Sequence, residues 1–265
     1  MNSTITAHTL KQMKANGERF SCLTAYDASF AQLIAEAGVE VLLVGDSLGM
    51  VIQGQESTLP VSVDDMVYHC RAVRRGSVNS LVMVDMPFMS CTSPEQALHN
   101  AGRLMKEGGA HMVKLEGGRC MLEAVRMLSA YGVPVCSHLG LLPQSVHKIG
   151  GYKVQGREVS DADAMLEDAL ALEESGVDVL LLECVPADLA QRITAAVSIP
   201  VIGIGAGPEC DGQVLVVYDM LGITPGKRPK FSKNFLSDAE DIPSALRNYN
   251  EAVKSATFPA KQHSF

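Results

Sequence analysis

Four acidic residues of this 265-residue chain stand at the ends of short apolar runs. The runs cover residues 41–46 (VLLVGD), 81–85 (LVMVD), 112–116 (MVKLE) and 179–183 (VLLLE). Such runs are typical of strands buried on both faces, and an acid at the strand end lies at the carboxyl edge of a parallel sheet, where ligands bind. Four carboxylates there indicate oxygen ligands for a hard divalent cation, together with a general base.

The first two acids predict a magnesium site. Asp46 and Asp85 come from different strands, and water and substrate oxygens would complete the octahedron around the ion. Ser47 follows Asp46, and its hydroxyl could donate to a substrate carbonyl or carboxylate. A structural alternative stands beside each assignment, because Asp46 and Ser47 are good turn formers and Asp85 is suited to a helix N-cap.

Lys114 and Glu116 lie two residues apart in one predicted strand, so their side chains face the same side. A lysine and a glutamate in a barrel interior are costly unless they are paired or used. A buried structural ion pair is one interpretation. In the other, Lys114 binds a substrate carboxylate and Glu116 is an outer-shell partner of the metal.

His138 and Glu183 end two further strands. His138 is either a hydrogen-bonded core residue or a donor to the substrate. Glu183 follows Leu180, Leu181 and Leu182, and apolar surroundings raise a carboxyl pKa toward the range of a general base. Glu183 is therefore the predicted base, with a structural carboxylate at the sheet edge as the alternative.

The composition limits the class of protein. With 47% hydrophobic and 20% charged residues, a large core is available, and 265 residues fit one barrel domain. The net charge of -8 and the lack of a basic stripe argue against a nucleic-acid partner. Seven cysteines without a CxxC spacing predict free thiols in a reducing compartment. The N-terminal residues show no apolar signal core, and no apolar span is long enough for a membrane, so we expect a cytoplasmic protein.

Eight predicted strands alternate with helical segments, which favours a single-domain (β/α)8 TIM barrel over an open sheet. The strands are expected at residues 20–26, 39–45, 81–85, 112–116, 133–138, 177–183, 200–205 and 214–218. The clearest helices are expected at 28–38, 93–106, 161–175 and 187–197, with Ser93 and Pro94 as a helix start. Residues 238–265 are expected to form one helix and a tail outside the barrel, within a single domain of residues 1–265.

Three further segments bear on a binding site. Residues 49–61 and 139–158 are long connections, suited equally to lids and to structural excursions. The glycine-rich run 203–207 could cradle a phosphate or leave space for a flat ring. The basic segment 226–233 (GKRPKFSK) is interpreted as a solvated surface loop rather than an anion site.

Eight segments together resemble one family. The chain is similar to the ketopantoate hydroxymethyltransferases, enzymes of pantothenate and coenzyme A biosynthesis. The segments are LVGDSLG (43–49), STLP (57–60), AVRRG (72–76), VKLEGG (113–118), HLGLLPQS (138–145), GGYKVQGR (150–157), LECVP (182–186) and PVIGIGAG (200–207). Jointly they are highly specific, and the similarity runs over nearly the whole chain.

The resemblance implies a reaction and its residues. A hydroxymethyl group would pass from 5,10-methylenetetrahydrofolate to 3-methyl-2-oxobutanoate, giving 2-dehydropantoate through a magnesium-stabilised enolate. One Mg²⁺ per subunit would be held by Asp46 and Asp85, with Glu116 nearby through water. The implied oxoacid contacts are Ser47, Asp46, Asp85 and Lys114, and Glu183 would accept the proton. The resemblance also implies a TIM barrel assembled into a homodecamer.

Two residues depart from the family pattern, and three other activities compete with the implied one. Ser137 replaces a glycine, and Leu142 removes a hydroxyl from a loop near the site. The competing interpretations are a metal-dependent lyase or mutase of the phosphoenolpyruvate/pyruvate barrel type, a Schiff-base aldolase with Lys114 as nucleophile, and a non-catalytic scaffold or oxoacid-responsive regulator. The complete acid set disfavours the last.

Overall fold

A closed barrel of eight parallel strands forms the centre of the molecule. The computed structural model describes residues 4–226 and 228–265. Each strand pairs with the next along the chain, and the eighth pairs with the first. The strands are β1 (Phe20–Thr24), β2 (Val41–Val44), β3 (Leu81–Asp85), β4 (Met112–Glu116), β5 (Val135–Gly140), β6 (Val179–Glu183), β7 (Val201–Ile204) and β8 (Gly212–Leu215). The predicted (β/α)8 fold is confirmed.

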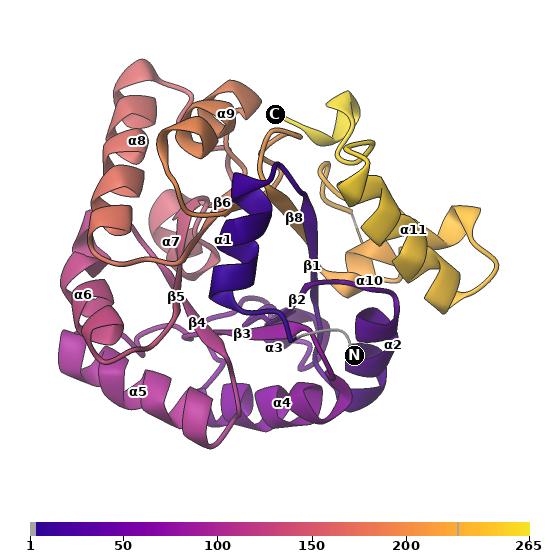
Figure 1. The fold of residues 1–265 in the computed structure, drawn as a ribbon, viewed down its shortest axis with the longest axis horizontal. Coiled ribbons are helices and arrows are strands. Elements are labelled where there is room, and N and C mark those ends of the chain that lie inside the picture. Colours follow the sequence, from indigo (N-terminus) through magenta and orange to yellow (C-terminus); the bar gives the residue numbers. More distant parts are fainter. Residues whose placement is uncertain (1–3, 227) are drawn as a thin grey trace.

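Helices surround the strands on the outside (Figure 1). They are α1 (Ala7–Ala15), α2 (Ala28–Glu36), α3 (Leu48–Val51), α4 (Val63–Gly76), α5 (Pro94–Lys106), α6 (Leu122–Ala130), α7 (Val146–Ile149), α8 (Val159–Glu174), α9 (Ala187–Ala196), α10 (Val217–Met220) and α11 (Ile242–Lys254). Short 3₁₀ turns lie at η1 (Arg119–Met121), η2 (Pro143–Ser145), η3 (Leu236–Asp238) and η4 (Lys261–His263). The predicted start of α5 is confirmed, because the Ser93 side chain accepts a hydrogen bond from the backbone N–H of Gln96 and Pro94 follows it.

The strands of the barrel are buried on both faces. Nearly every strand residue is buried, since one face of each strand points into the barrel and the other contacts the helices. Apolar runs rather than alternating patterns are therefore the correct signal for these strands. β3 and β4 have their predicted bounds. The other strands differ at their ends by a few residues, where hydrogen bonding rather than hydropathy decides the boundary.

The prediction for the eighth strand is wrong at its carboxyl end. The strand was expected over 214–218, but β8 runs from Gly212 to Leu215 and α10 begins at Val217. The Thr24 hydroxyl accepts a hydrogen bond from the Val217 backbone N–H at 2.9 Å, so the chain turns away from the barrel there. The connection from β7 to β8, residues 205–211, contains no helix.

Two elements cover the barrel from outside. Helix α1 lies across the near end of the barrel in Figure 1. Lys14 ties it there, with Nζ 2.9 Å from Asp211 Oδ2 and 2.8 Å from the Thr194 carbonyl oxygen. The C-terminal segment was expected outside the barrel. Its helix α11 packs against β1 and α2, and therefore belongs to the outer helical layer.

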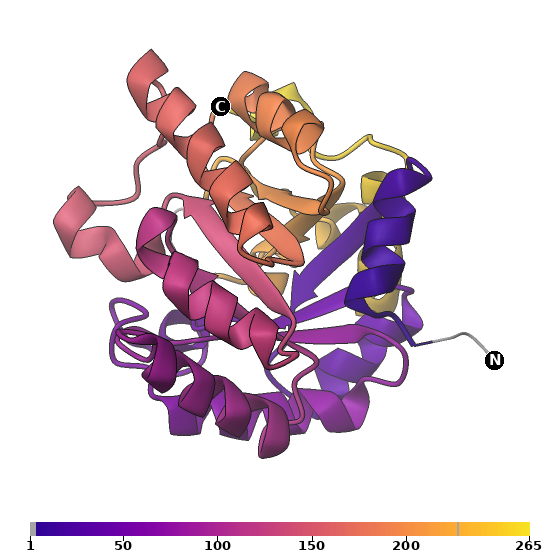
Figure 2. The same cartoon turned by 60° about the vertical axis from the view of Figure 1, so that its left-hand side comes forward.

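The two long connections leave the barrel at its carboxyl end. Residues 49–61 include most of α3, and residues 141–158 contain η2 and α7. Figure 2 shows α7 standing away from the body of the barrel. The Tyr152 hydroxyl lies 3.6 Å from the Met50 sulfur, so the two connections touch each other.

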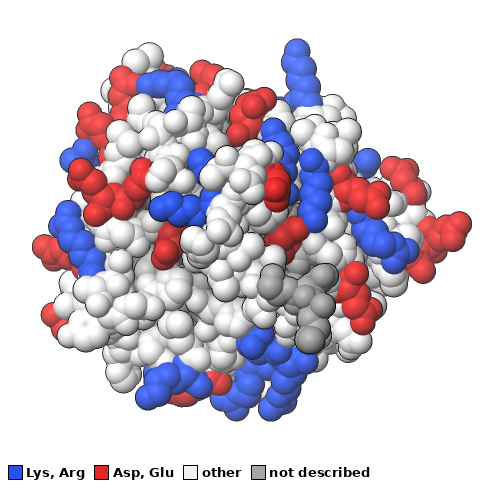
Figure 3. Space-filling model, viewed as in Figure 1, with Lys and Arg blue, Asp and Glu red and all other residues white. Residues whose placement is uncertain are grey.

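The outer surface carries mixed charge. In Figure 3, basic and acidic side chains are interspersed over most of the face shown, without one continuous basic stripe. Among the described residues, no helix combines the length and the apolar character needed to span a membrane.

Candidate active site

The carboxyl ends of the strands open into one cavity of about 670 Å³. All seven residues singled out from the sequence line it: Asp46, Ser47, Asp85, Lys114, Glu116, His138 and Glu183. They come from β2 to β6 and the residues directly after them. The barrel thus brings together side chains that are up to 137 positions apart in the chain, from Asp46 to Glu183.

Asp46 and Asp85 are adjacent and buried. The Asp46 backbone N–H donates to Asp85 Oδ2 at 2.9 Å, so the end of β3 fixes the turn that follows β2. Burial, then repulsion from Asp85, raises the pKa of Asp46 to about 7. Neither residue is a helix N-cap in the structure, which removes the structural alternative that the sequence left open for Asp85.

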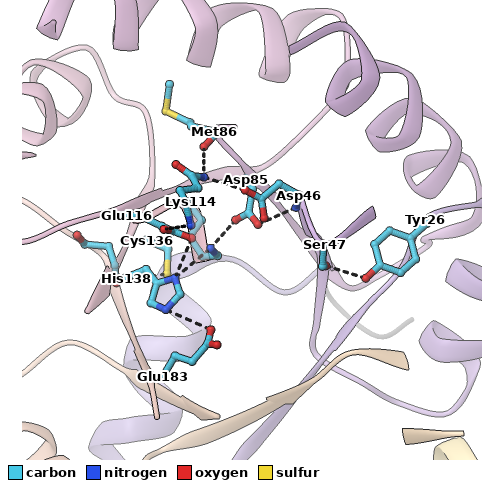
Figure 4. A network of polar contacts seen from close by, with 12 residues as sticks. Tyr26, Asp46, Ser47, Asp85, Met86, Lys114, Glu116, Cys136, His138 and Glu183 are labelled. Atoms are coloured by element: carbon cyan, nitrogen blue, oxygen red, sulfur yellow. Dashed lines mark hydrogen bonds and ion pairs between the residues drawn. The ribbon is translucent and has the colours of Figure 1, made fainter. Parts of the chain in front are cut away.

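Lys114 is the single cation at the centre of these acids within the described lining (Figure 4). Its Nζ lies 2.7 Å from Asp85 Oδ1, although only 4% of the residue is exposed. Burial lowers the pKa of the amine, but Asp85, Glu116 and Asp46 more than offset this effect and raise it. The amine is therefore protonated, which disfavours the Schiff-base interpretation because a nucleophilic lysine must be neutral.

His138 lies between Lys114 and Glu183 (Figure 4). Nδ1 is 3.4 Å from Lys114 Nζ, and Nε2 is 3.4 Å from Glu183 Oε2. Burial, and then the charge of Lys114, lowers the pKa of His138 well below its usual value, so the ring is neutral. Lys114 can only donate, so Nδ1 accepts and Nε2 carries the hydrogen. Nε2 has no hydrogen-bond partner among the described residues and can donate to a ligand.

Glu183 ends β6 on the far side of His138. Burial raises its pKa to about 7, against the lowering effect of Lys114. The next residue, Cys184, has φ +47°, a left-handed conformation uncommon for a side-chain-bearing residue. Its N–H donates to the Ile204 carbonyl oxygen at 2.9 Å, which anchors the chain immediately after Glu183.

Glu116 and Ser47 complete the predicted set. Burial, with the charges of Asp46 and Asp85, raises the pKa of Glu116 well above its usual value although Lys114 lowers it. Glu116 Oε1 is 3.7 Å from His138 Nδ1. The Ser47 hydroxyl lies 2.9 Å from the Tyr26 hydroxyl, and Tyr26 was not selected from the sequence.

These residues fit a divalent cation. Three buried carboxylates surround one lysine: Asp46, Asp85 and Glu116. The pKa values of Asp46 and Glu116 are raised, because burial disfavours their charged forms and one lysine does not balance the negative charge of three buried carboxylates. Within residues 4–226 and 228–265, no three His, Cys, Asp or Glu side chains form a ready-made cage. Magnesium sites commonly use one or two carboxylates and complete their coordination with water and substrate.

Several lining residues were missed or assigned elsewhere. Arg228, Lys230 and Phe231 line the outer part of the cavity, although their segment was interpreted as a solvated loop. Phe265 lies there as well, and Lys230 Nζ is 4.8 Å from the centre of its ring. No periodicity or spacing connects these residues to the strand ends, so only the folded chain identifies them.

The glycine-rich run after β7 leaves space for rings of the protein itself. Gly205 has φ +61°, and a Cβ there would lie 3.0 Å from both Phe231 and Phe265. A side chain at this position would therefore collide with the aromatic wall. At Gly205 the space is filled by these two rings of the protein, and both interpretations offered by the sequence, a phosphate cradle and space for a flat ring, stay predictions.

The fold and the carboxylate-lined cavity define a class of α/β-barrel proteins. A solved 2,3-dimethylmalate lyase of the PEP mutase/isocitrate lyase superfamily is similar, with a TM-score of 0.59 and 16% identity over 83% of this chain and 84% of that one. A solved phosphonopyruvate hydrolase gives a TM-score of 0.63 at 12% identity, covering 83% and 84%. At these identities the similarity shows the fold alone.

Within that class, the chain belongs to the ketopantoate hydroxymethyltransferase family, whose model matches residues 4–261. A 3-methyl-2-oxobutanoate hydroxymethyltransferase of Nitrosococcus oceani is 63% identical over 98% of this chain and 99% of its own length. The enzyme of that name from Erwinia tasmaniensis is 58% identical, covering 98% of each. The resemblance inferred from the sequence motifs is confirmed.

Proposed function

We propose that this chain transfers a hydroxymethyl group from 5,10-methylenetetrahydrofolate to 3-methyl-2-oxobutanoate, giving 2-dehydropantoate for coenzyme A biosynthesis. The observation that carries the proposal is the cavity arrangement: Glu183, with a pKa of about 7, shares one cavity with the Asp46–Asp85 pair. A base poised near neutral pH and a cation site are the two groups needed to remove a proton next to a carbonyl. Family membership supports the substrate assignment.

The inner part of the cavity suits the oxoacid. Asp46 and Asp85 would hold one Mg²⁺ per subunit, with Glu116 as an outer partner. The bound ion would act as a Lewis acid toward the carbonyl of the substrate. Lys114 supplies a fixed positive charge for the carboxylate, and the free Nε2–H of His138 is a donor for a substrate oxygen.

Glu183 then acts as the base. It takes the proton from C3 of the oxoacid, and the electron pair left on C3 forms the new bond to the methylene carbon of the folate. Both C–N bonds of that carbon break, and the two nitrogens take up the C3 proton and one proton of water. The hydroxyl group left from that water bonds to the methylene carbon, so tetrahydrofolate and 2-dehydropantoate are released. The neutral His138 ring lies beside Glu183, with Nε2 3.4 Å from Oε2, and adds no charge that would neutralise the carboxylate.

The outer part of the cavity suits the folate. A small oxoacid leaves much of the cavity empty, and the remaining wall combines Phe231 and Phe265 with Arg228 and Lys230. Aromatic rings stack on flat heterocycles, and the cations would attract the carboxylates of the glutamate tail. We further propose a homodecamer in the cytoplasm, as the resemblance to the family implies, with no nucleic-acid or membrane partner.

Proton exchange at C3 tests this proposal. Purified protein with Mg²⁺ should exchange the C3 proton of 3-methyl-2-oxobutanoate into deuterated water without folate, because Glu183 and the cation suffice for that step. Adding 5,10-methylenetetrahydrofolate should yield 2-dehydropantoate. A C3 exchange rate that is unchanged when a chelator removes Mg²⁺ would contradict the assignment. So would the absence of 2-dehydropantoate when both substrates are present.

A further inference from the structure

One residue that the sequence left without a role contacts the carboxylates of the site. Gln144 lies in η2, in the long connection after β5. Its side-chain Nε2 donates to Asp46 Oδ2 at 2.8 Å and to the Met86 carbonyl oxygen at 3.0 Å. Its backbone N–H donates to Glu116 Oε2 at 3.1 Å. A single residue thus spans the ends of β2, β3 and β4.

The chemistry of these contacts fixes the orientation of the amide. A carboxylate and a backbone carbonyl can only accept, so the NH₂ group of Gln144 must face both of them. Both of its hydrogens are then used, and the amide cannot flip without setting oxygen against oxygen. A carboxylate held by such a fixed donor loses rotational freedom, and hydrogen bonds to charged groups are the stronger kind.

We propose that Gln144 is a positioning residue for the cation and the oxoacid. By occupying Oδ2 of Asp46, it holds the carboxylate in one rotation and leaves Oδ1 for the ion. Its backbone bond to Glu116 does the same for the outer partner. The inference rests on the proposed function, because it takes Asp46 and Glu116 as the groups that serve the cation.

The same bonds couple the connection after β5 to the site. The part of this connection around α7 stands away from the barrel (Figure 2), and Lys148 and Lys153 are exposed there. If Gln144 holds the Asp46 that binds the ion, then occupancy of the site stabilises the segment that carries Gln144. This coupling is reciprocal by thermodynamic linkage.

Gln144→Met tests the inference, since methionine has a similar length and no donor. The matched control is Gln155→Met in the same connection, because the Gln155 side chain donates only to the Lys153 carbonyl oxygen. The Mg²⁺ concentration for half-maximal C3 exchange should rise roughly tenfold or more in Gln144→Met, the usual scale for partners of metal ligands. The rate at saturating Mg²⁺ should stay within about threefold of wild type, because Glu183 is unchanged.

Two measurements do not depend on turnover. Calorimetric titration of the oxoacid in the presence of Mg²⁺ should show weaker binding in Gln144→Met, again by roughly tenfold. Oxoacid and Mg²⁺ together should protect Lys148 and Lys153 from trypsin in wild type and in Gln155→Met, and should fail to do so in Gln144→Met. Gln144→Ala should behave like Gln144→Met, and it replaces that variant in the same measurements if Gln144→Met folds poorly.

Equal magnesium dependence in Gln144→Met, Gln144→Ala and Gln155→Met would overturn the inference. So would a loss confined to the rate at saturating Mg²⁺, since a positioning role predicts a change in affinity. The proposed function is judged separately by the wild-type protein. Wild-type protein that neither binds the oxoacid with Mg²⁺ nor exchanges its C3 proton would contradict that function, whatever the variants do.

Discussion

Glu183 is the residue whose protonation state should set the rate of proton removal. Only its ionised form can accept the C3 proton, so exchange should rise with pH through about 7 and level off above it. Bound Mg²⁺ favours the ionised form of Glu183 and moves the midpoint of the pH profile lower.

Glu183→Gln should reduce C3 proton exchange, followed by NMR, roughly 100-fold or more. The variant should still bind the oxoacid and Mg²⁺, as measured by calorimetry. Exchange at the wild-type rate would assign the base role to a group other than Glu183.

Substitution of Asp46 or Asp85 should impair magnesium binding, whereas substitution of Glu183 should impair proton removal. Asp46→Asn and Asp85→Asn replace a carboxylate ligand by a neutral amide, a poorer ligand for Mg²⁺. Each should weaken magnesium binding and nearly abolish turnover, as measured by calorimetry and a product assay at limiting Mg²⁺. Full activity of either variant under these conditions would exclude that residue as a ligand.

The role of Lys114 distinguishes a metal-dependent mechanism from a Schiff-base mechanism. The pKa of Lys114 is raised by the surrounding carboxylates, which favours the charged amine and disfavours a Schiff base. Borohydride added with the oxoacid should trap no adduct on the wild-type protein, and Lys114→Arg should keep partial exchange because the charge remains. Mass spectrometry that found a reduced adduct on Lys114 would reverse this assignment.

At the scale of elements, the end of β5 must pass very close to the end of β6. Gly140 has φ +92°, and a Cβ there would lie 2.2 Å from the Glu183 carbonyl oxygen. Gly140→Ala should therefore displace Glu183 and lower exchange by roughly tenfold or more, since small misplacements of a catalytic group are costly. Gly132→Ala is the control: Gly132 has φ +75° but open space around it. Equal exchange in the two variants would show that backbone strain alone, without the clash, accounts for any loss.

At the scale of the whole molecule, the barrel closes between its first and last strands, and α11 bridges that seam. The Tyr249 hydroxyl is 2.9 Å from the carbonyl oxygens of both Cys22 in β1 and Gln213 in β8. Tyr249→Phe removes this buried donor and should lower the free energy of unfolding by about 1–2 kcal/mol. Urea unfolding measures the change, with the exposed Tyr131→Phe as control. Equal midpoints would show that the hydroxyl does not stabilise the seam.

The sequence alone determined the fold class and the inner site. Long apolar runs ending in acids predict buried parallel strands, and parallel strands bring their carboxyl ends to one edge. The positions of Asp46, Asp85, Glu116 and Glu183 in these runs therefore suffice to place the four carboxylates together. The start of α5 at Ser93 is equally local, because capping depends on adjacent residues.

Only the tertiary structure decided which residues complete the site from outside the strands. Phe231 and Phe265 line the cavity and Gln144 donates to Asp46, all from segments where no periodicity links sequence position to direction. The end of β8 depended on a hydrogen bond from Val217 to Thr24, 193 positions away. The raised pKa of Glu183 has the same origin: apolar neighbours suggest burial, but its extent and the opposing charge of Lys114 follow from distances that exist only in the folded barrel.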